Sequence, residues 1–292
     1  MVVKFLNRQA VVISGAFFKT AALRDEPYEI VEAPGLFISQ MKREGMRADL
    51  FTFMQAMSET KPMYDYHLEW HSLAILRIAT YEDWWKKQIK DKTRNMVRKA
   101  QKAGVKLALC EFNDDFVRGI MSIYNECPLR QGKPFKHYGK DFDTVKREHE
   151  TFLERSDFIG AWHGGELIGF AKLVHGENVS SLMQIISKIA FRDKSPTNAL
   201  IAKAVEICAA RNVQYLHYGI WSRQGLGEFK RYHGFARCDI PRYFVPLNLK
   251  GEMMLKLKLH RKALDFIPEK WLDRLVVLRN RWNLFRYKLA GN

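Results

Sequence analysis

Short apolar runs of strand-like length alternate with polar breaks through the first 80 residues of the chain. Runs of about four to eight residues rich in Val, Ile, Phe and Thr are typical of β-strands. Between them, residues 35–45 have apolar positions spaced as on one face of a short helix. The pattern therefore predicts a small α/β region. The expected strands lie within residues 10–18, 27–33, 48–54 and 73–80.

Residues 81–104 have the pattern of one long helix. Thr80 is a suitable N-cap, acidic side chains follow in the first turn, and Gly104 is a typical stop. Apolar residues recur at spacings of about three, four and seven, which predicts one buried stripe. The stripe would consist of Trp85, Ile89, Met96, Ala100 and Ala103.

A row of basic side chains runs beside that stripe at intervals of four residues. Like charges at this spacing destabilise a helix slightly unless an anion, or carboxylates from elsewhere, lie against them. The row is therefore a candidate anion-binding or nucleic-acid-binding surface, and a solvated helix face is the alternative. Its members are Lys86, Lys90, Arg94, Arg98 and Lys102.

From residue 105 onward, strand and helix signals follow in a regular order, which we interpret as β-α-α-β-β-β-α-β-α-β. The sequence HGGE at 163–166 predicts a tight turn between two strands. Ser195 as N-cap and Pro196 at the first helical position predict a helix that runs to about Arg211. The expected strands lie at 105–112, 158–162, 167–175, 179–187, 213–221 and 237–247, and the helices at 114–127, 142–156, 196–211 and 225–235.

The segment beyond residue 248 is helical in pattern and basic, with 11 Lys and Arg against 4 Asp and Glu. Its apolar residues alternate spacings of four and three, which gives an amphipathic stripe. Such a stripe packs on its own protein or, in the alternative, lies on an anionic membrane through residues 266–292. The stripe consists of Trp271, Leu275, Leu278, Trp282, Phe285 and Leu289.

The charge of the whole chain narrows the partners that it is suited to bind. Its 48 Lys and Arg residues against 32 Asp and Glu give a formal net charge of +16 and an isoelectric point near 9.7. This balance favours contact with polyanions such as tRNA or another nucleic acid, anionic lipid or phosphorylated substrates. A merely basic protein is the alternative.

Cysteine usage and hydropathy bear on the compartment. The 4 cysteines are widely spaced and include no Cys-x-x-Cys pair, so no disulfide framework, zinc site or other metal is indicated. The sequence lacks an apolar run of membrane-spanning length, and the N-terminal segment is too interrupted for a signal peptide. These features predict a cytoplasmic protein, peripheral to the membrane if the tail binds lipid.

Three segments, taken with the order of elements, resemble the acyl-CoA N-acyltransferase (GNAT) fold and its FemAB-like branch. They are RNMVRKAQKAGVKL at 94–107, SPTNALIAKAVEICAARN at 195–212 and GLGEFKRYHGF at 225–235. The resemblance implies an α/β (α+β) fold with a mixed central sheet flanked by helices and splayed between two central strands to admit the donor. It also admits a degenerate first unit of a tandem pair. The expected domains are 1–103, 104–248 and the basic helical tail 249–292.

The resemblance also locates a donor-binding loop. In GNAT enzymes, glycines before the central helix let backbone N–H groups approach the CoA pyrophosphate. The matching stretch here, 192–197, has no glycine, contains Pro196 without an N–H group and carries the negative Asp193. Acyl-CoA is therefore one candidate donor among others, and a plain helix start is the alternative to a phosphate site. The expected donor-binding residues are Arg192, Lys194, Ser195, Thr197 and Asn198.

The segment 225–235 supplies the leading catalytic candidate. Many GNAT enzymes have a tyrosine acid four residues before the Gly of their terminal Gly-Phe, and Lys230 occupies that position here. By resemblance, Lys230 would protonate the leaving group or face the oxyanion; a lysine extending from a helix with core phenylalanines is the alternative. The further catalytic candidates are Tyr232, Tyr218 and His217, of which the last two point to opposite faces of their strand.

The loop 128–140, between two helices, borders the acceptor site in a GNAT-like unit and is dense in hydrogen-bond donors. Loops on a rigid scaffold often carry function, so we expect substrate contacts here rather than a plain basic loop. Strand and hairpin residues Gln184, His175 and Glu166 are weaker candidates for a general base. The expected substrate-binding residues are Arg130, Gln131, Lys136, His137, Tyr138 and Gln184.

These features predict an acyltransferase that moves an acyl or aminoacyl group from acyl-CoA or aminoacyl-tRNA to an amine. Little beyond proximity, Lys230 and backbone donors would be needed to stabilise the tetrahedral intermediate. The competing hypothesis is a catalytically inert GNAT-like module that binds RNA or an anionic membrane through its basic surfaces.

Overall fold

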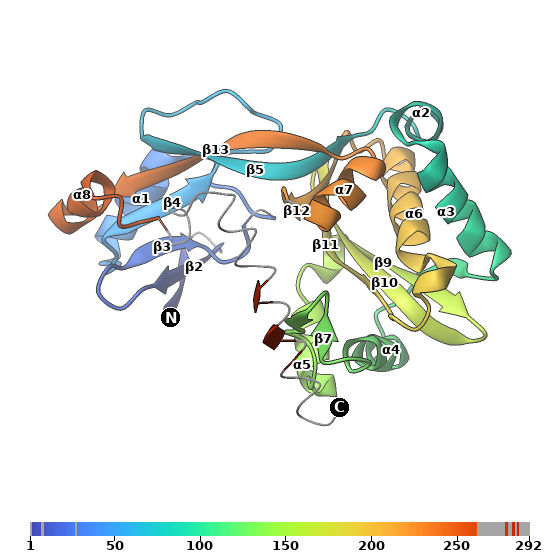
Figure 1. The fold of residues 1–292 in the computed structure, drawn as a ribbon. Helices are drawn as coiled ribbons and strands as arrows, with labels where there is room; N and C mark the ends of the chain where they lie inside the picture. The colour runs from blue at the N-terminus through green and yellow to red at the C-terminus, as the bar shows by residue number, and fades with distance from the viewer. Residues whose placement is uncertain are drawn as a thin grey trace. The chain divides into compact units, whose positions relative to one another are not determined.

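The computed structural model describes residues 2–6, 9–26, 28–222, 224–261, 278–279, 282–283 and 285. Two compact units divide the chain (Figure 1). The first comprises Met1–Leu73 with Arg237–Phe266, and the second Ala74–Ala236 with Ile267–Asn292. The first unit is therefore built from two stretches that are separate in the sequence, whereas the expected boundaries lay after residues 103 and 248.

The first unit contains mixed strands in the order β1-β2-β3-β4-β13-β5, and β5 continues into the second unit from Ala74 onward. The pairs β1–β2, β2–β3 and β4–β13 are antiparallel, and β3–β4 is parallel. Two helices, α1 and α8, belong to this unit. The bounds are β1 Val2–Leu6, β2 Gln9–Ser14, β3 Thr20–Leu23, α1 Pro34–Arg43, β4 Leu50–Met54, β5 His67–Arg77, β13 Ala236–Pro246 and α8 Leu249–Lys256.

Aromatic stacking forms the core of the first unit. Phe37 on α1 stacks on Phe51 of β4, which in turn stacks on Phe53, with ring centroids 5.4 and 5.5 Å apart. Tyr243 of β13 is fully buried against the same cluster. The predicted helix and the strands at 48–54 and 73–80 are confirmed in outline. The strand expected at 27–33 is wrong, and β1 and β3 were not predicted.

The second unit contains the strand order β12-β11-β10-β9-β6. Its neighbours are antiparallel except for the parallel pair β11–β12. The order of elements from β6 to β13 agrees with the sequence prediction, with the two short strands β7 and β8 added. The bounds are β6 Lys106–Cys110, α4 Asp114–Tyr124, β7 Leu129–Arg130, β8 Lys133–Pro134, α5 Phe142–His149, β9 Ser156–His163, β10 Glu166–His175, β11 Val179–Ser187, α6 Pro196–Ala210, β12 Tyr215–Ile220 and α7 Gln224–Tyr232.

Helices cover both faces of these five strands (Figure 1). Successive residues of β9 enter different clusters: Ile159 packs with α6, whereas Phe158 packs with α4 and α5. This alternation is the expected behaviour of a strand buried on both faces. The fold is thus a mixed α/β sheet flanked by helices, as the sequence predicted.

The segment expected as one long helix is instead divided. It consists of α2 (Tyr81–Asp83), the π-helical turn η1 (Trp84–Gln88) and α3 (Asp91–Lys102). Ile89 is extended, with φ −109° and ψ 149°, and separates the last two. Thr80 does cap the first turn, its side chain accepting a hydrogen bond from Asp83 N–H. The break shifts the helical register, so Trp84, Thr93 and Val97 are buried where Trp85 and Met96 were expected.

The predicted helical tail is described in part. Its first helix, α8, is confirmed, whereas Trp271, Leu275 and Leu289 of the expected stripe lie outside the described residues. The remaining stripe members, Leu278, Trp282 and Phe285, are 53–61% exposed. Among the helices that the structure describes, none combines the length and hydropathy needed to cross a bilayer.

Candidate functional site

Strands β11 and β12 pair over a short stretch. Their parallel register runs from Val179 and Tyr215 to Ser181 and His217, although β11 continues to Ser187. Strand β11 also contains a bulge at Met183, close to the point where its pairing with β12 ends. The bulge is evident because Lys172 of β10 pairs with Gln184, whereas the next residue, Leu173, pairs with Leu182. Backbone at a bulge leaves the regular ladder and re-aims its side chains. The predicted splay between two central strands is therefore present.

A cavity of about 560 Å³ lies at this splay. Its wall combines the C-terminal part of β11, the N-terminus of α6, Tyr218 of β12 and α7. We call it the β11–β12 cavity. Of the residues proposed from the sequence, the cavity is lined by Arg130, Gln131, Arg192, Ser195, Thr197, Asn198 and Tyr218.

The start of α6 is uncapped by a side chain. Ser195 occupies the expected N-cap position, but it adopts a left-handed conformation with φ 57° and makes no side-chain cap hydrogen bond. Pro196 does occupy the first helical position. Thr197 Oγ1 lies 2.8 Å from Ser187 Oγ and so links the helix start to β11. A helix N-terminus without a side-chain cap is favourable for a negatively charged ligand.

The loop that leads into α6 is held by a carboxylate that sequence analysis missed. Glu126, just after α4, accepts hydrogen bonds from Ile189 N–H at 2.6 Å and Ala190 N–H at 2.8 Å. It also pairs with Arg130 at 3.0 Å. The spacing of four residues between Glu126 and Arg130 was the available sequence signal. The carboxylate of Glu126 therefore already accepts hydrogen bonds from two backbone N–H groups of the loop.

Arg130 is anchored as well as placed at the cavity. Its guanidinium donates to Ser187 O at 2.7 Å and to Ile123 O at 2.9 Å, and it lies 4.7 Å from the centre of the Phe135 ring. Burial is the main reason that the pKa of Arg130 is lowered from its usual value, partly offset by Glu126. This arginine fixes the rim of the cavity and keeps its charge there.

Tyr218 and Lys230 lie against each other beside the cavity. Lys230 Nζ is 4.7 Å from the centre of the Tyr218 ring and donates to Ile220 O at 2.7 Å. Burial lowers the pKa of Lys230 to about 8 and raises the pKa of Tyr218 to about 12. Tyr218 lines the cavity, whereas Lys230, 3% exposed, is not part of its lining. The hydroxyl of Tyr218 is thus protonated at neutral pH, and the residue belongs to the wall of the cavity.

His217 takes the opposite side of β12. It is buried, and its Nδ1 lies 3.2 Å from Ser181 Oγ. Of the two neighbouring strand candidates, only Tyr218 therefore lines the cavity. The further base candidates have other partners: His175 is 3.0 Å from Asp157, and Glu166 is 2.5 Å from Lys188.

Some expected substrate residues meet in a separate cluster. Gln184 Nε2 donates to Tyr124 OH at 2.9 Å, and that hydroxyl lies 2.9 Å from His149 Nε2. His137 stacks on Tyr124 with 4.5 Å between ring centroids. Burial is the main cause that lowers the pKa of both histidines to about 4. This cluster does not line the β11–β12 cavity. The remaining loop candidates, Lys136 and Tyr138, are exposed.

Other candidates also lie outside the cavity wall. Tyr232 is 40% exposed, with Lys92 Nζ 5.6 Å from its ring, and Lys194 pairs with Asp193 at 3.8 Å.

The expected basic row is interrupted at Ile89. Arg94 is used internally, because it donates to the carbonyls of Trp85 and Ile89 at 2.7 Å each. The other members, Lys86, Lys90, Arg98 and Lys102, are exposed.

Comparison with known proteins agrees with this architecture. Residues 87–231 match the family described as an acetyltransferase (GNAT) domain. The structure of FemX is similar, with a TM-score of 0.61 at 11% identity, over 85% of this chain and 86% of that chain. Comparison with curated proteins finds no match.

Two further solved structures share the fold. One is the C-terminal domain (DUF2156) of a putative lysylphosphatidylglycerol synthetase from Agrobacterium fabrum, with a TM-score of 0.57 at 14% identity over 87% of this chain and 86% of that one. The other is L-PGS from Bacillus licheniformis, with a TM-score of 0.57 at 14% identity over 88% of each chain. Residues 87–231 are thus a GNAT domain, and the fold of the chain is similar to that of FemX.

Proposed function

We propose that this chain transfers an acyl or aminoacyl group from an activated donor to an amine at the β11–β12 cavity. The observation that carries the proposal is the early end of strand pairing at Ser181 and His217, with a cavity of about 560 Å³ at the N-terminus of α6. Ligand pockets usually measure about 300–1,000 Å³. The cavity is large enough for the acyl group and the adjoining part of its carrier.

The reaction needs few protein groups. The amine nitrogen attacks the carbonyl carbon of a thioester or ester, a C–N bond forms, and negative charge develops on the carbonyl oxygen. Collapse of this intermediate breaks the C–S or C–O bond, the nitrogen loses a proton, and the leaving thiolate or alkoxide gains one. Tyr218 is the group at the cavity that is suited to donate that proton. We therefore assign the acid role to Tyr218 rather than to Lys230.

The loop before α6 favours aminoacyl-tRNA over acyl-CoA as the donor. Its N–H groups are largely engaged: two donate to Glu126, and those of Lys194 and Ser195 donate to Phe191 O and Arg192 O at 3.0 and 3.2 Å. A pyrophosphate in the usual GNAT pose needs such groups free. Arg192, exposed at the cavity, remains suited to a carrier phosphate. The similarity to a protein named as a lysylphosphatidylglycerol synthetase is a further argument for aminoacyl transfer.

Binding measurements separate the two donors. The chain is titrated with acetyl-CoA by calorimetry and, in parallel, with a mixture of aminoacylated tRNA and with the same tRNA after deacylation. We expect tighter binding of the aminoacylated tRNA, because the aminoacyl end enters the cavity. Tight binding of acetyl-CoA would refute the tRNA donor while leaving acyl transfer standing.

A cavity-filling variant makes the test specific. Leu226 lines the cavity and is 40% exposed, so a larger side chain there would fill the cavity. Leu226→Trp should therefore abolish the preference for aminoacylated tRNA without weakening the binding of deacylated tRNA. Leu153, 41% exposed and absent from the cavity wall, gives the matched control Leu153→Trp. If the parent protein binds both tRNA forms equally and transfers no acyl group from either donor, the enzymatic proposal is refuted. That result would favour an inert RNA-binding module.

A membrane role is the second candidate. The exposed apolar side chains Leu278, Trp282 and Phe285 lie in the basic tail, a combination typical of helices that bind anionic membranes. Co-sedimentation with vesicles containing phosphatidylglycerol, compared with neutral phosphatidylcholine vesicles, tests it. Binding that survives replacement of all three side chains by Ser would contradict this role.

A further inference from the structure

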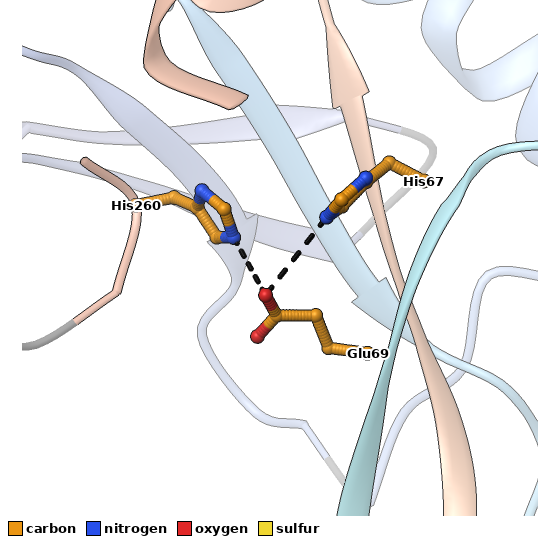
Figure 2. A group of neighbouring side chains, drawn as sticks. All are labelled: His67, Glu69 and His260. Atoms are coloured by element: carbon orange, nitrogen blue, oxygen red, sulfur yellow. Dashed lines mark hydrogen bonds and ion pairs between the residues drawn. The ribbon is translucent and has the colours of Figure 1, made fainter. Parts of the chain in front are cut away.

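Two histidines and a glutamate gather in the first unit. His67 and Glu69 share a face of β5, because strand residues two apart point the same way, and His260 follows α8 (Figure 2). Glu69 Oε1 lies 2.8 Å from Nε2 of His260 and 3.8 Å from Nε2 of His67. All ligand atoms of the group lie within 4.8 Å of one another. Their polar ends therefore converge on one point.

The cluster of His67, Glu69 and His260 is partly shielded from solvent. The His260 side chain is 2% exposed and the Glu69 side chain 26%, whereas that of His67 is 42% exposed. The ring of Phe244 lies 4.8 Å from that of His260 and 6.2 Å from that of His67. An ion at the centre would have an apolar wall on one side and access from solvent past His67.

The ligand types suit a transition metal. Zn²⁺ binds histidine nitrogen and carboxylate oxygen at about 2.0–2.2 Å, and three protein ligands with one open position are a common arrangement. Ligand atoms at that distance in tetrahedral geometry are about 3.4 Å apart. The separations of 2.8 and 3.8 Å in this group lie on either side of that value. Small side-chain adjustments are sufficient to enclose the ion.

We propose that His67, Glu69 and His260 form a binding site for a divalent transition-metal ion, zinc first among them, with water in the fourth position. Nδ1 of His260 has no hydrogen-bond partner within the described part of the chain. When the ion replaces the hydrogen bond between Nε2 and Glu69 Oε1, the ring proton moves to Nδ1 and the lone pair of Nε2 faces the ion. The site is independent of the proposed transfer reaction.

An ion-pair network is the competing explanation. Arg261 Nε donates to Glu69 Oε1 at 2.7 Å, the same oxygen that faces His260. Binding of the metal requires Arg261 to move to Oε2 or to solvent, and its side chain, 37% exposed, has room to do so. Carboxylates that bind metals are commonly hydrogen-bonded on their other oxygen. Arg261 would then orient the ligand.

Metal binding would have a structural consequence. His260 belongs to the segment after α8, and its two partners belong to β5, 191 and 193 residues earlier in the chain. An ion shared by both would attach that segment to the strand. Because a ligand that binds the folded state stabilises it, zinc should raise the melting temperature.

The test uses full-length protein without a histidine tag, stripped of metal with a chelator and titrated with Zn²⁺ by calorimetry. We expect uptake of about one equivalent. His260→Gln and Glu69→Gln should each weaken binding by about 100-fold or more, since loss of an outer-shell partner alone costs about 10–100-fold. Cobalt in place of zinc should give a visible absorption band that both variants lose.

Controls keep the result decisive. His163→Ala removes a partly buried histidine of the other unit and should leave zinc uptake unchanged. If the His260 variant fails to fold, zinc uptake by His67→Ala provides the test. The His67 side chain is 42% exposed, so its removal should leave the fold intact. No saturable uptake by the parent protein, or uptake retained in the folded ligand variants, would overturn the proposal and leave the ion pair as the role of these residues.

Discussion

The ammonium group of Lys230 lies over the face of the Tyr218 ring, 4.7 Å from its centre, and donates to the carbonyl of Ile220. A cation above an aromatic face is attracted by the negative potential of the ring. This contact holds the ring of Tyr218, a residue of the cavity wall. In the proposed mechanism, the lysine at the position that matches the family's acid positions another residue, and the acid is a tyrosine on the preceding strand.

Tyr218→Phe tests that assignment. Removal of the hydroxyl should lower kcat by about 10²- to 10⁴-fold, the usual contribution of a general acid. Donor affinity should change little, because the ring still fills its place. Steady-state transfer assays over a range of donor concentration separate kcat from KM. Tyr215→Phe, a partly buried tyrosine of the same strand outside the cavity wall, is the control. Equal kcat in the parent and Tyr218→Phe would refute the role.

Lys230 should give the protein an unusual pH dependence of stability. Its pKa is lowered by burial from 10.5 to about 8 in the folded chain. Between these values the unfolded chain binds more protons than the folded chain, so the free energy of unfolding rises with pH. Lys230→Met should reduce that rise by about 1–3 kcal/mol between about pH 7.5 and pH 10.5.

Urea denaturation at several pH values measures the difference. Lys172, whose pKa burial also lowers to about 8, is present in both proteins, so its contribution cancels. Parallel stability curves for the parent and the variant would contradict the assigned pKa of Lys230.

Local signals explain how much of the fold could be predicted. The Gly-Gly turn at 164–165 has both residues at positive φ, and the Ser-Pro start of α6 was placed correctly because it follows from backbone chemistry alone. The break at Ile89 was not predictable in the same way, because neither Gly nor Pro marks it. It depends on Arg94, whose guanidinium reaches back and donates to the freed carbonyls of Trp85 and Ile89, a contact that only the folded chain reveals.

The residues of the candidate site, too, could be predicted only where a local sequence signal marks them. Tyr218 could be proposed because strand alternation allows one of two neighbours to face the cleft. Its partner Lys230 lies on the next helix, and no spacing rule predicts that their side chains meet. His67 and Glu69 have strand spacing, but His260 is 191 residues beyond Glu69, so no spacing rule joins them.

Glu126 should control donor binding through the loop before α6. Glu126→Gln keeps the shape of the side chain but removes the charge that holds two N–H groups and Arg130. Hydrogen bonds to a charged group contribute about 1.5–3 kcal/mol each, so we expect a loss of about 2 kcal/mol in stability. We also expect about tenfold weaker donor binding, since the helix start that faces the donor becomes less ordered.

Calorimetry with the donor and urea denaturation measure the two effects of Glu126→Gln. Glu206→Gln, which removes a surface pair with Lys203, should change neither. Unaltered donor affinity in Glu126→Gln, with the fold intact, would show that the carboxylate has no part in binding.

Arg94 should be structural, in contrast to its neighbours in the expected basic row. Its guanidinium donates to Trp85 O and Ile89 O and pairs with Asp91 at 2.8 Å, so it satisfies the carbonyls exposed by the helix break. Arg94→Lys retains the charge but loses the forked geometry, and should lower the free energy of unfolding by about 1–3 kcal/mol. Arg98→Lys, on the exposed side of α3, should stay within about 0.5 kcal/mol. Urea denaturation of Arg94→Lys and Arg98→Lys measures the two free energies of unfolding. Equal stability of the two variants would contradict the structural role of Arg94 and leave it as one more surface cation that could bind a polyanion.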